Sequence, residues 1–149
     1  MQLPEAWNQV DWKTTISQVE TLRGEAFTCS KSGNLVKLRD VQKRILESPA
    51  TLLTAIRRVT SKSARETAGV DELIVINDSD KWSLFEDFLG MDLLQWWPPP
   101  VRRIYILKAD KKRWRPLGIP TIKDRVIQAV VTEALEPEWE ARFEGGSYG

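Results

Sequence analysis

A strongly basic run lies between residues 100 and 124, which read PVRRIYILKADKKRWRPLGIPTIKD. Residues 101 to 125 hold nine basic side chains against two acidic ones, a net charge of +7 in a chain whose total is +1. So large a local excess is typical of a surface that binds phosphate or nucleic acid. The nine cations are Arg102, Arg103, Lys108, Lys111, Lys112, Arg113, Arg115, Lys123 and Arg125.

Composition limits the other chemistry that the chain could perform. It has no histidine and a single cysteine, Cys29, which excludes zinc centres, Cys–His nucleophiles and an internal disulfide. Its one Asp-x-Asp sequence, Asp78-Ser-Asp80, has polar neighbours that favour a turn ahead of Trp82. We therefore predict no catalytic residue and no metal site in this chain.

Charge and hydropathy elsewhere indicate a globular intracellular protein. Apolar residues make up 42% of the chain, charged residues 29%, and no run is long enough to span a membrane. Acidic blocks at 71–92 and 133–144 are interpreted as solvated faces, or as a balance that leaves one face positive. Most of the seven tryptophans are expected to pack in cores or to cap surfaces, with base stacking as the alternative.

The first 60 residues predict three amphipathic helices. Asp11 is a candidate N-cap for the first, and the pair Gly33 and Asn34 suits a turn with positive φ before the second. Ser48-Pro49 would end the second helix and open the third, since proline is tolerated in a first turn. Such short helices must pack on one another to bury their apolar stripes.

The second half predicts a loop over 61–71, a helix over 82–94 and an extended Trp-Trp-Pro-Pro-Pro segment. Alternation over 102–108 indicates a strand, with Ile104 and Ile106 on one side and Arg103, Tyr105 and Leu107 on the other. A turn at 110–113 and an antiparallel strand over 114–119 would complete a hairpin.

The final segment is the clearest helix in the pattern. Thr121 can cap it, with Asp124 three residues later, and Pro137 should stop or kink it. The predicted fold class is therefore α+β and helix-rich, with N-terminal amphipathic helices followed by a β-hairpin and a helix.

Three stretches carry a resemblance to a known family: RRVTSKSARETAGVD (57–71), PPVRRIYILKADKKRWRPLGIPTIKDRVIQAVV (99–131) and EALEPEWEARFEGGSYG (133–149). Together they resemble the start of a group II intron-encoded reverse transcriptase/maturase, and the likeness covers nearly the whole chain. It implies an N-terminal helical region over 1–72 and, over 73–149, part of the fingers region, resembling the fingers of a reverse transcriptase.

The resemblance also implies roles for the cations. Lys108 and Arg115 match the basic pair that contacts the triphosphate of the incoming nucleotide, and a hairpin could present both to phosphate oxygens. The alternative is an ordinary basic hairpin exposed to water. Contacts to RNA are implied for the rest of the basic run and for an earlier cluster: Arg57, Arg58, Lys62, Arg65, Arg102, Arg103, Lys111, Lys112, Arg113, Lys123 and Arg125.

The family's catalytic parts have no match in this sequence. Its metal-binding carboxylates come from an early palm aspartate and a Tyr-Ala-Asp-Asp hairpin, and neither motif is present. Mg²⁺ is therefore expected only with a palm, no cofactor is expected here, and we expect no polymerisation by this chain alone.

The sequence departs from the family pattern at three places. Glu72 stands where the family usually has Gly after Val-Asp, and Leu107 stands where it usually has Pro before Lys108. The hairpin turn lacks the Gly that the family often has there. Because Gly is the residue suited to positive φ, the sequence predicts a turn of another geometry.

Four functions compete at this point. The chain could be a reverse transcriptase fragment that binds RNA and nucleotide, a stand-alone maturase-like RNA-binding module, half of a split polymerase, or an unpartnered helical fragment. The partners implied are group II intron or template RNA and, for the split enzyme, a separate chain with the palm; no membrane is implied. The family places the protein in the bacterial cytoplasm or an organelle.

Overall fold

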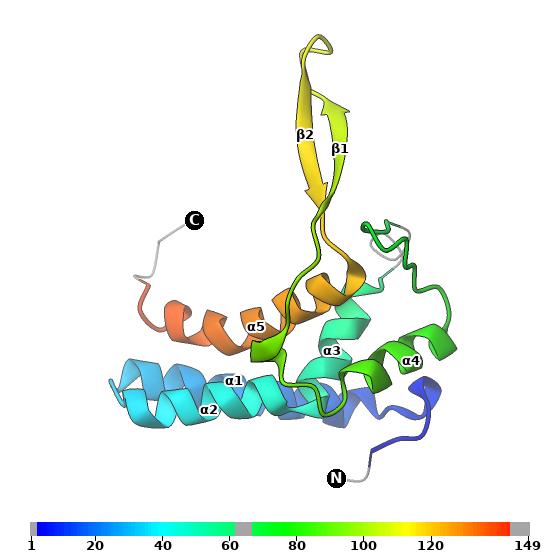
Figure 1. Ribbon diagram of the computed structural model, residues 1–149. Helices are drawn as coiled ribbons and strands as arrows, with labels where there is room; N and C mark the ends of the chain where they lie inside the picture. The colour runs from blue at the N-terminus through cyan, green and yellow to red at the C-terminus, as the bar shows by residue number, and fades with distance from the viewer. Residues whose placement is uncertain (1–2, 62–66, 144–149) are drawn as a thin grey trace.

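Figure 1 shows a computed structural model of the chain, which describes residues 3–61 and 67–143. Five helices form the body: α1 (Trp12–Lys31), α2 (Leu35–Glu47), α3 (Pro49–Val59), α4 (Asp78–Phe88) and α5 (Ile122–Glu140). Two short 3₁₀ turns occupy Trp7–Gln9 and Leu93–Gln95. The antiparallel strands β1 (Arg102–Leu107) and β2 (Trp114–Ile119) form a hairpin that projects from the body. The predicted α+β, helix-rich class is confirmed.

Local capping explains where most helices begin. Asp11 accepts a hydrogen bond from the Thr14 amide, Ser48 accepts one from the Thr51 amide, and Thr121 accepts one from the Asp124 amide. The caps predicted at Asp11 and Thr121 are confirmed, as is the predicted opening of the third helix at Ser48-Pro49. Gly33 has φ 73° as predicted, but Asn34 has φ −82° and caps α2 instead, so its predicted positive φ is wrong.

Two predicted boundaries are wrong. The helix expected at 82–94 begins at Asp78, because Asn77 and Asp80 form a reciprocal capping box, and it ends at Phe88 before Gly90 turns with φ 77°. Asp78 and Asp80 therefore lie in a first helical turn, not in the polar turn we expected. Helix α5 runs through Pro137, so the stop predicted there is wrong, whereas the alternative of a kink stays a prediction.

Helix α5 lies against the other helices and shares their core. Its residues Ile122, Val126, Val130 and Ala134 are buried, and Val126 and Val130 join Leu53 and Ile56 of α3 and Phe85 of α4 in the larger of two hydrophobic clusters. The predicted boundary near residue 72 is not tested, but this cluster contains residues from both sides of it. The smaller cluster joins α1, α2 and Ala134 of α5.

Two buried glutamates on α5 connect it to three neighbouring helices. Glu133 is 3% exposed and pairs with Arg23 of α1 and Arg58 of α3. Glu138, also 3% exposed, accepts hydrogen bonds from Arg39 at 2.8 Å and Gln42 at 2.7 Å, both on α2. A buried carboxylate needs such partners, because desolvation penalises an unpaired charge.

The bonds to Glu138 also explain its acidity. Gln42 and Arg39 stabilise the carboxylate and, with Arg142, hold the pKa of Glu138 below its ordinary value despite burial.

None of the helices in the described ranges is long and apolar enough to cross a membrane.

Candidate nucleic-acid interface

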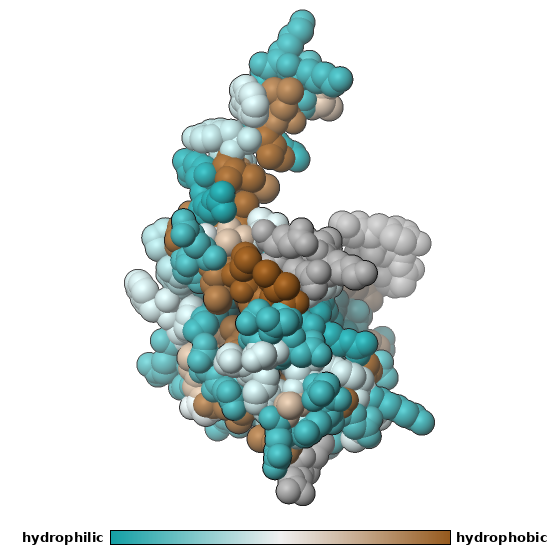
Figure 2. Space-filling model, turned by 90° about the vertical axis from the view of Figure 1, so that its right-hand side faces the viewer, coloured by the Kyte–Doolittle hydropathy of each residue, from teal (hydrophilic) through white to brown (hydrophobic). Residues whose placement is uncertain are grey.

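The hairpin consists of two antiparallel strands joined by a turn that the Asp110 side chain stabilises. Ile106 pairs with Arg115, Leu107 pairs with Trp114, and the Lys108 amide continues the ladder to the Arg113 carbonyl at 2.8 Å. The hairpin stands clear of the helices, with hydrophilic side chains at its tip and hydrophobic ones along its length (Figure 2). Residues 102–119 carry seven basic side chains and one acidic one, so the arm has a net charge of +6.

Asp110 organises the turn. Its carboxylate accepts bonds from the Lys112 and Arg113 amides and from the Arg113 guanidinium at 2.7 Å. These bonds lower the pKa of Asp110.

Lys111 adopts φ 54°, so the turn retains a left-handed residue although it has no Gly. Glu72 likewise has φ 58°, at the other position where the resemblance leads us to expect Gly. Non-glycine residues in this region carry backbone strain.

The two residues expected to bind a triphosphate lie near one end of the hairpin. Arg115 is opposite Ile106, and Lys108 follows Ile106 by two residues, so strand alternation puts both cations on the same face. Both side chains are exposed. Their common placement agrees with the predicted role, which itself stays a prediction.

Five cations of the arm have no side-chain partner among residues 3–61 and 67–143. They are exposed, and none of them contributes to an ion pair or a side-chain hydrogen bond there; they are Arg103, Lys108, Lys111, Lys112 and Arg115. Below they are called the free arm cations. Arg113 differs, because Asp110 pairs with it.

The other predicted RNA contacts are engaged with the protein. The Arg57 guanidinium lies over the Trp12 ring at 4.5 Å, and Arg58 pairs with Glu133. Lys123 pairs with Asp87 at 2.9 Å, which offsets its unfavourable position in the first turn of α5. Lys62 and Arg65, predicted in the same set, lie outside the described residues.

Arg102 and Arg125 hold a loop at the base of the arm. Arg102 donates to the Ala68 carbonyl at 3.3 Å, and Arg125 donates to the Thr67 and Pro120 carbonyls. Partial burial among these groups lowers the pKa of Arg125. Both arginines were expected to contact RNA, and in the structure they position backbone.

The same loop approaches α5 at Gly69. A Cβ at this residue would lie 2.7 Å from the Thr121 Cα, closer than side chains are found in proteins. Asp124, beside the cap, accepts bonds from the Thr121 hydroxyl and from the Trp96 indole at 2.7 Å. Loop, extended segment and helix start therefore form a single support beneath the arm.

Acidic groups do not gather into a metal site in the described part of the chain. No three His, Cys, Asp or Glu residues there are arranged to hold an ion. Asp80 accepts the Asn77 and Ile76 amides, and Asp78 pairs with Lys81 at 2.9 Å. The Asp-x-Asp sequence is used to begin a helix.

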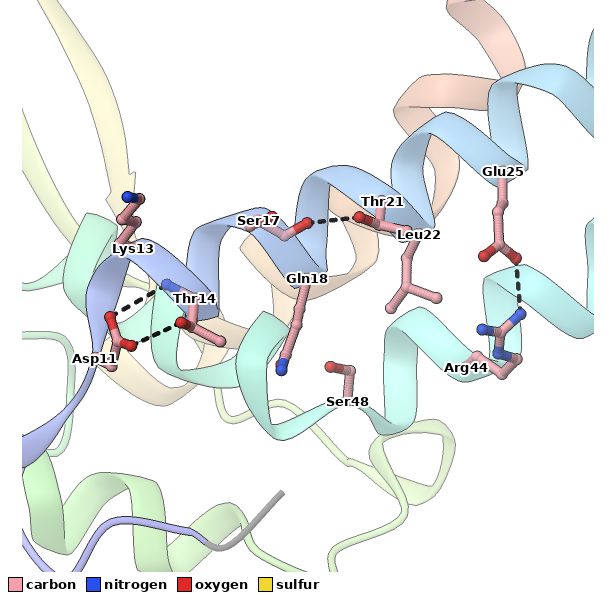
Figure 3. A pocket seen from close by; sticks show the side chains of 10 residues that line it. All are labelled: Asp11, Lys13, Thr14, Ser17, Gln18, Thr21, Leu22, Glu25, Arg44 and Ser48. Atoms are coloured by element: carbon pink, nitrogen blue, oxygen red, sulfur yellow. Dashed lines mark hydrogen bonds and ion pairs between the residues drawn. The ribbon is translucent and has the colours of Figure 1, made fainter.

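A polar hollow between α1 and the α2–α3 junction is another candidate (Figure 3). Its groups satisfy one another: Thr14 donates to Asp11, Thr21 donates to the Ser17 carbonyl, and Glu25 pairs with Arg44 at 2.8 Å. Such an arrangement offers a ligand little that is not already bonded, so the arm is the better site.

Comparison with known proteins identifies the family. A family model described as the N-terminal domain of reverse transcriptase matches residues 7–88, more than half of the chain. The chain belongs to the reverse transcriptase family. It corresponds to an N-terminal part of a group II intron reverse transcriptase/maturase, as the resemblance indicated.

Individual relatives match shares of this chain that range from about a third to nearly all of it. Protein YkfC of Escherichia coli is 36% identical over 71% of this chain and 28% of its own length. The group II intron-encoded protein LtrA of Lactococcus lactis is 50% identical over 36% of this chain and 9% of its own length. Maturase-like protein 1 of Euglena gracilis is 28% identical over 93% of this chain. The chain spans less than a third of the length of these relatives.

We predict that Gly69→Ala destabilises this reverse transcriptase segment. The added methyl group collides with the Thr121 backbone, and overpacking of this kind costs about 1–3 kcal/mol. Gly24→Ala is the matched control, because its Cβ meets nothing within 4 Å in the middle of α1 and should stabilise the helix by roughly 0.5–1 kcal/mol. Urea unfolding measures both changes, and equal stability of the two variants would contradict the close contact.

Proposed function

We propose that this chain binds group II intron or template RNA through the projecting hairpin, and that Lys108 and Arg115 bind the triphosphate of an incoming nucleotide. The observation that supports the proposal most strongly is the division of the cations. Of the predicted RNA contacts that the structure describes, Arg57, Arg58 and Lys123 on the body are engaged with protein groups, whereas the five free arm cations lie together without a partner among the described residues.

Electrostatics favours a phosphate ligand at this arm. The free arm cations repel one another on a two-stranded support whose one acid, Asp110, is bonded within the turn. Phosphates would neutralise them and release counterions, which gives RNA binding its salt dependence. An arm that merely faces water would gain nothing from this concentration of charge. The relatives that are named for a group II intron and for a maturase support RNA as the ligand.

In this proposal the chain binds RNA and the nucleoside triphosphate, and nucleotide transfer depends on palm residues that this sequence does not contain. The described acids do not fit a two-metal site, since no three of them are arranged to hold a metal ion. We therefore derive no metal-dependent step from them. We place the protein in the bacterial cytoplasm or an organelle, where the family's intron RNA would be found.

A second candidate is one part of a polymerase that associates with a separate palm. An exposed apolar group at the end of α5 favours it: Leu135 is 42% exposed, Trp139 48% and Phe143 58%. Leu135 and Trp139 lie four residues apart on α5, and Phe143, just beyond the end of the helix, stacks on Trp139. Another polypeptide segment could bury this group.

Removing three free arm cations should reduce the salt dependence of RNA binding. For Arg103→Gln/Lys111→Gln/Lys112→Gln, we expect the slope of log affinity against log salt to become shallower by about 2, at about 0.7 per phosphate contact on a single strand. Fluorescence anisotropy with labelled intron RNA measures it. Arg57→Gln is the control, because Arg57 already covers Trp12 and should leave the slope unchanged. An unaltered slope in the triple variant would refute the RNA part of the proposal.

The nucleotide part has a separate readout. Lys108→Gln and Arg115→Gln should each weaken binding of a fluorescent nucleoside triphosphate by about tenfold, the order of a lost charge-assisted hydrogen bond. Lys112→Gln, at the tip of the arm, should leave this affinity within about twofold if only the pair touches phosphate. Equal loss in all three variants would show a general charge effect and contradict a specific triphosphate site.

A further inference from the structure

The arm has two unlike faces. Strand alternation and register place Ile104, Ile106, Leu117 and Arg115 on one of them. The other, called the aromatic face below, contains Arg103, Tyr105, Leu107, Trp114 and Pro116. The face that carries Lys108 and Arg115 is thus aliphatic between its cations, and the opposite face carries both rings of the hairpin.

Both rings of the aromatic face are open to solvent. Tyr105 is 59% exposed and Trp114 63% exposed. Neither ring takes part in an aromatic or cation–π contact within the described ranges, whereas Arg57 covers Trp12 and Phe143 stacks on Trp139.

The two rings are diagonal neighbours across the hairpin. Tyr105 lies opposite Pro116, and Trp114 precedes Pro116 by two residues on the same face. Diagonal neighbours in an antiparallel pair are about 7–8 Å apart, which brings both rings within reach of one short segment of ligand. Arg103, on the same face, is a free arm cation.

We propose that the aromatic face binds unpaired RNA bases by stacking, with Trp114 as the main platform and Tyr105 as the second. The inference rests on the proposed function, because the same arm binds the RNA backbone, and it adds that the strand must be single. In a duplex the π-faces of the bases are covered by their neighbours, whereas unpaired bases can stack on aromatic side chains.

Charge decides between RNA and a protein partner for this face. A protein that covered the aromatic face would also have to desolvate or neutralise Arg103, the free arm cation on that face. A single strand brings one phosphate with every base, so stacking and neutralisation come from the same ligand.

The test compares one labelled RNA as a single strand and annealed to its complement, bound to the full chain. Trp114→Ala should weaken binding of the single strand about tenfold, the order of one stacked base, and leave duplex binding nearly unchanged. Because no charge is removed, the salt slope should stay the same. Trp114→Phe should recover most of the affinity. Trp97→Ala is the matched control, since Trp97 is 89% exposed and lies outside the arm.

The outcomes separate the inference from the function beneath it. The stacking assignment would be overturned if Trp114→Ala left the affinity for the single strand unchanged, or if it weakened binding of single strand and duplex equally. Salt-dependent RNA binding through the cations would stand in either case. Failure of the unmodified chain to bind either RNA would instead refute the proposed function, and the inference with it. If Trp114→Ala lowers the thermal midpoint of unfolding, two other variants decide. Tyr105→Ala should weaken binding of the single strand, and Trp114→Phe should restore most of that affinity.

Discussion

The ion pairs of the two buried glutamates on α5 are the interaction on which the rest of the structure depends. Glu133 and Glu138 together reach arginines or amides on α1, α2 and α3, so one helix fixes the positions of three others. Each carboxylate is buried and would be strongly unfavourable without its partners. The same helix begins at the base of the hairpin, and the body that the glutamates hold together is therefore the support from which the arm projects.

This constraint also sorts the basic residues by role. Arg58 pairs with the buried Glu133, and Arg102 and Arg125 donate to carbonyls of the loop that contains Gly69. These three candidate RNA contacts therefore also stabilise the fold. The free arm cations differ from them, because they lie without a partner among the described residues on a two-stranded element with exposed aromatic rings.

Features set by neighbouring residues could be predicted from sequence. The caps at Asp11 and Thr121 and the alternation of Ile104 and Ile106 depend on contacts within a few residues. The family resemblance indicated how the helices and the hairpin follow one another. The roles of Arg58 and Arg125 depend on groups 75 and 58 residues away, which no local pattern reveals. The positive φ of Lys111 was also missed, because a turn without Gly gives no sequence signal for it.

We propose that the arm, and not the helical body, contacts RNA. Ultraviolet crosslinking of the intact chain to intron RNA, followed by mass spectrometry of the crosslinked peptides, locates the contact. We expect crosslinks within residues 103–115, with Trp114 and Tyr105 prominent among them. Crosslinks concentrated on α3 or on the first turn of α5, with none in the arm, would contradict it.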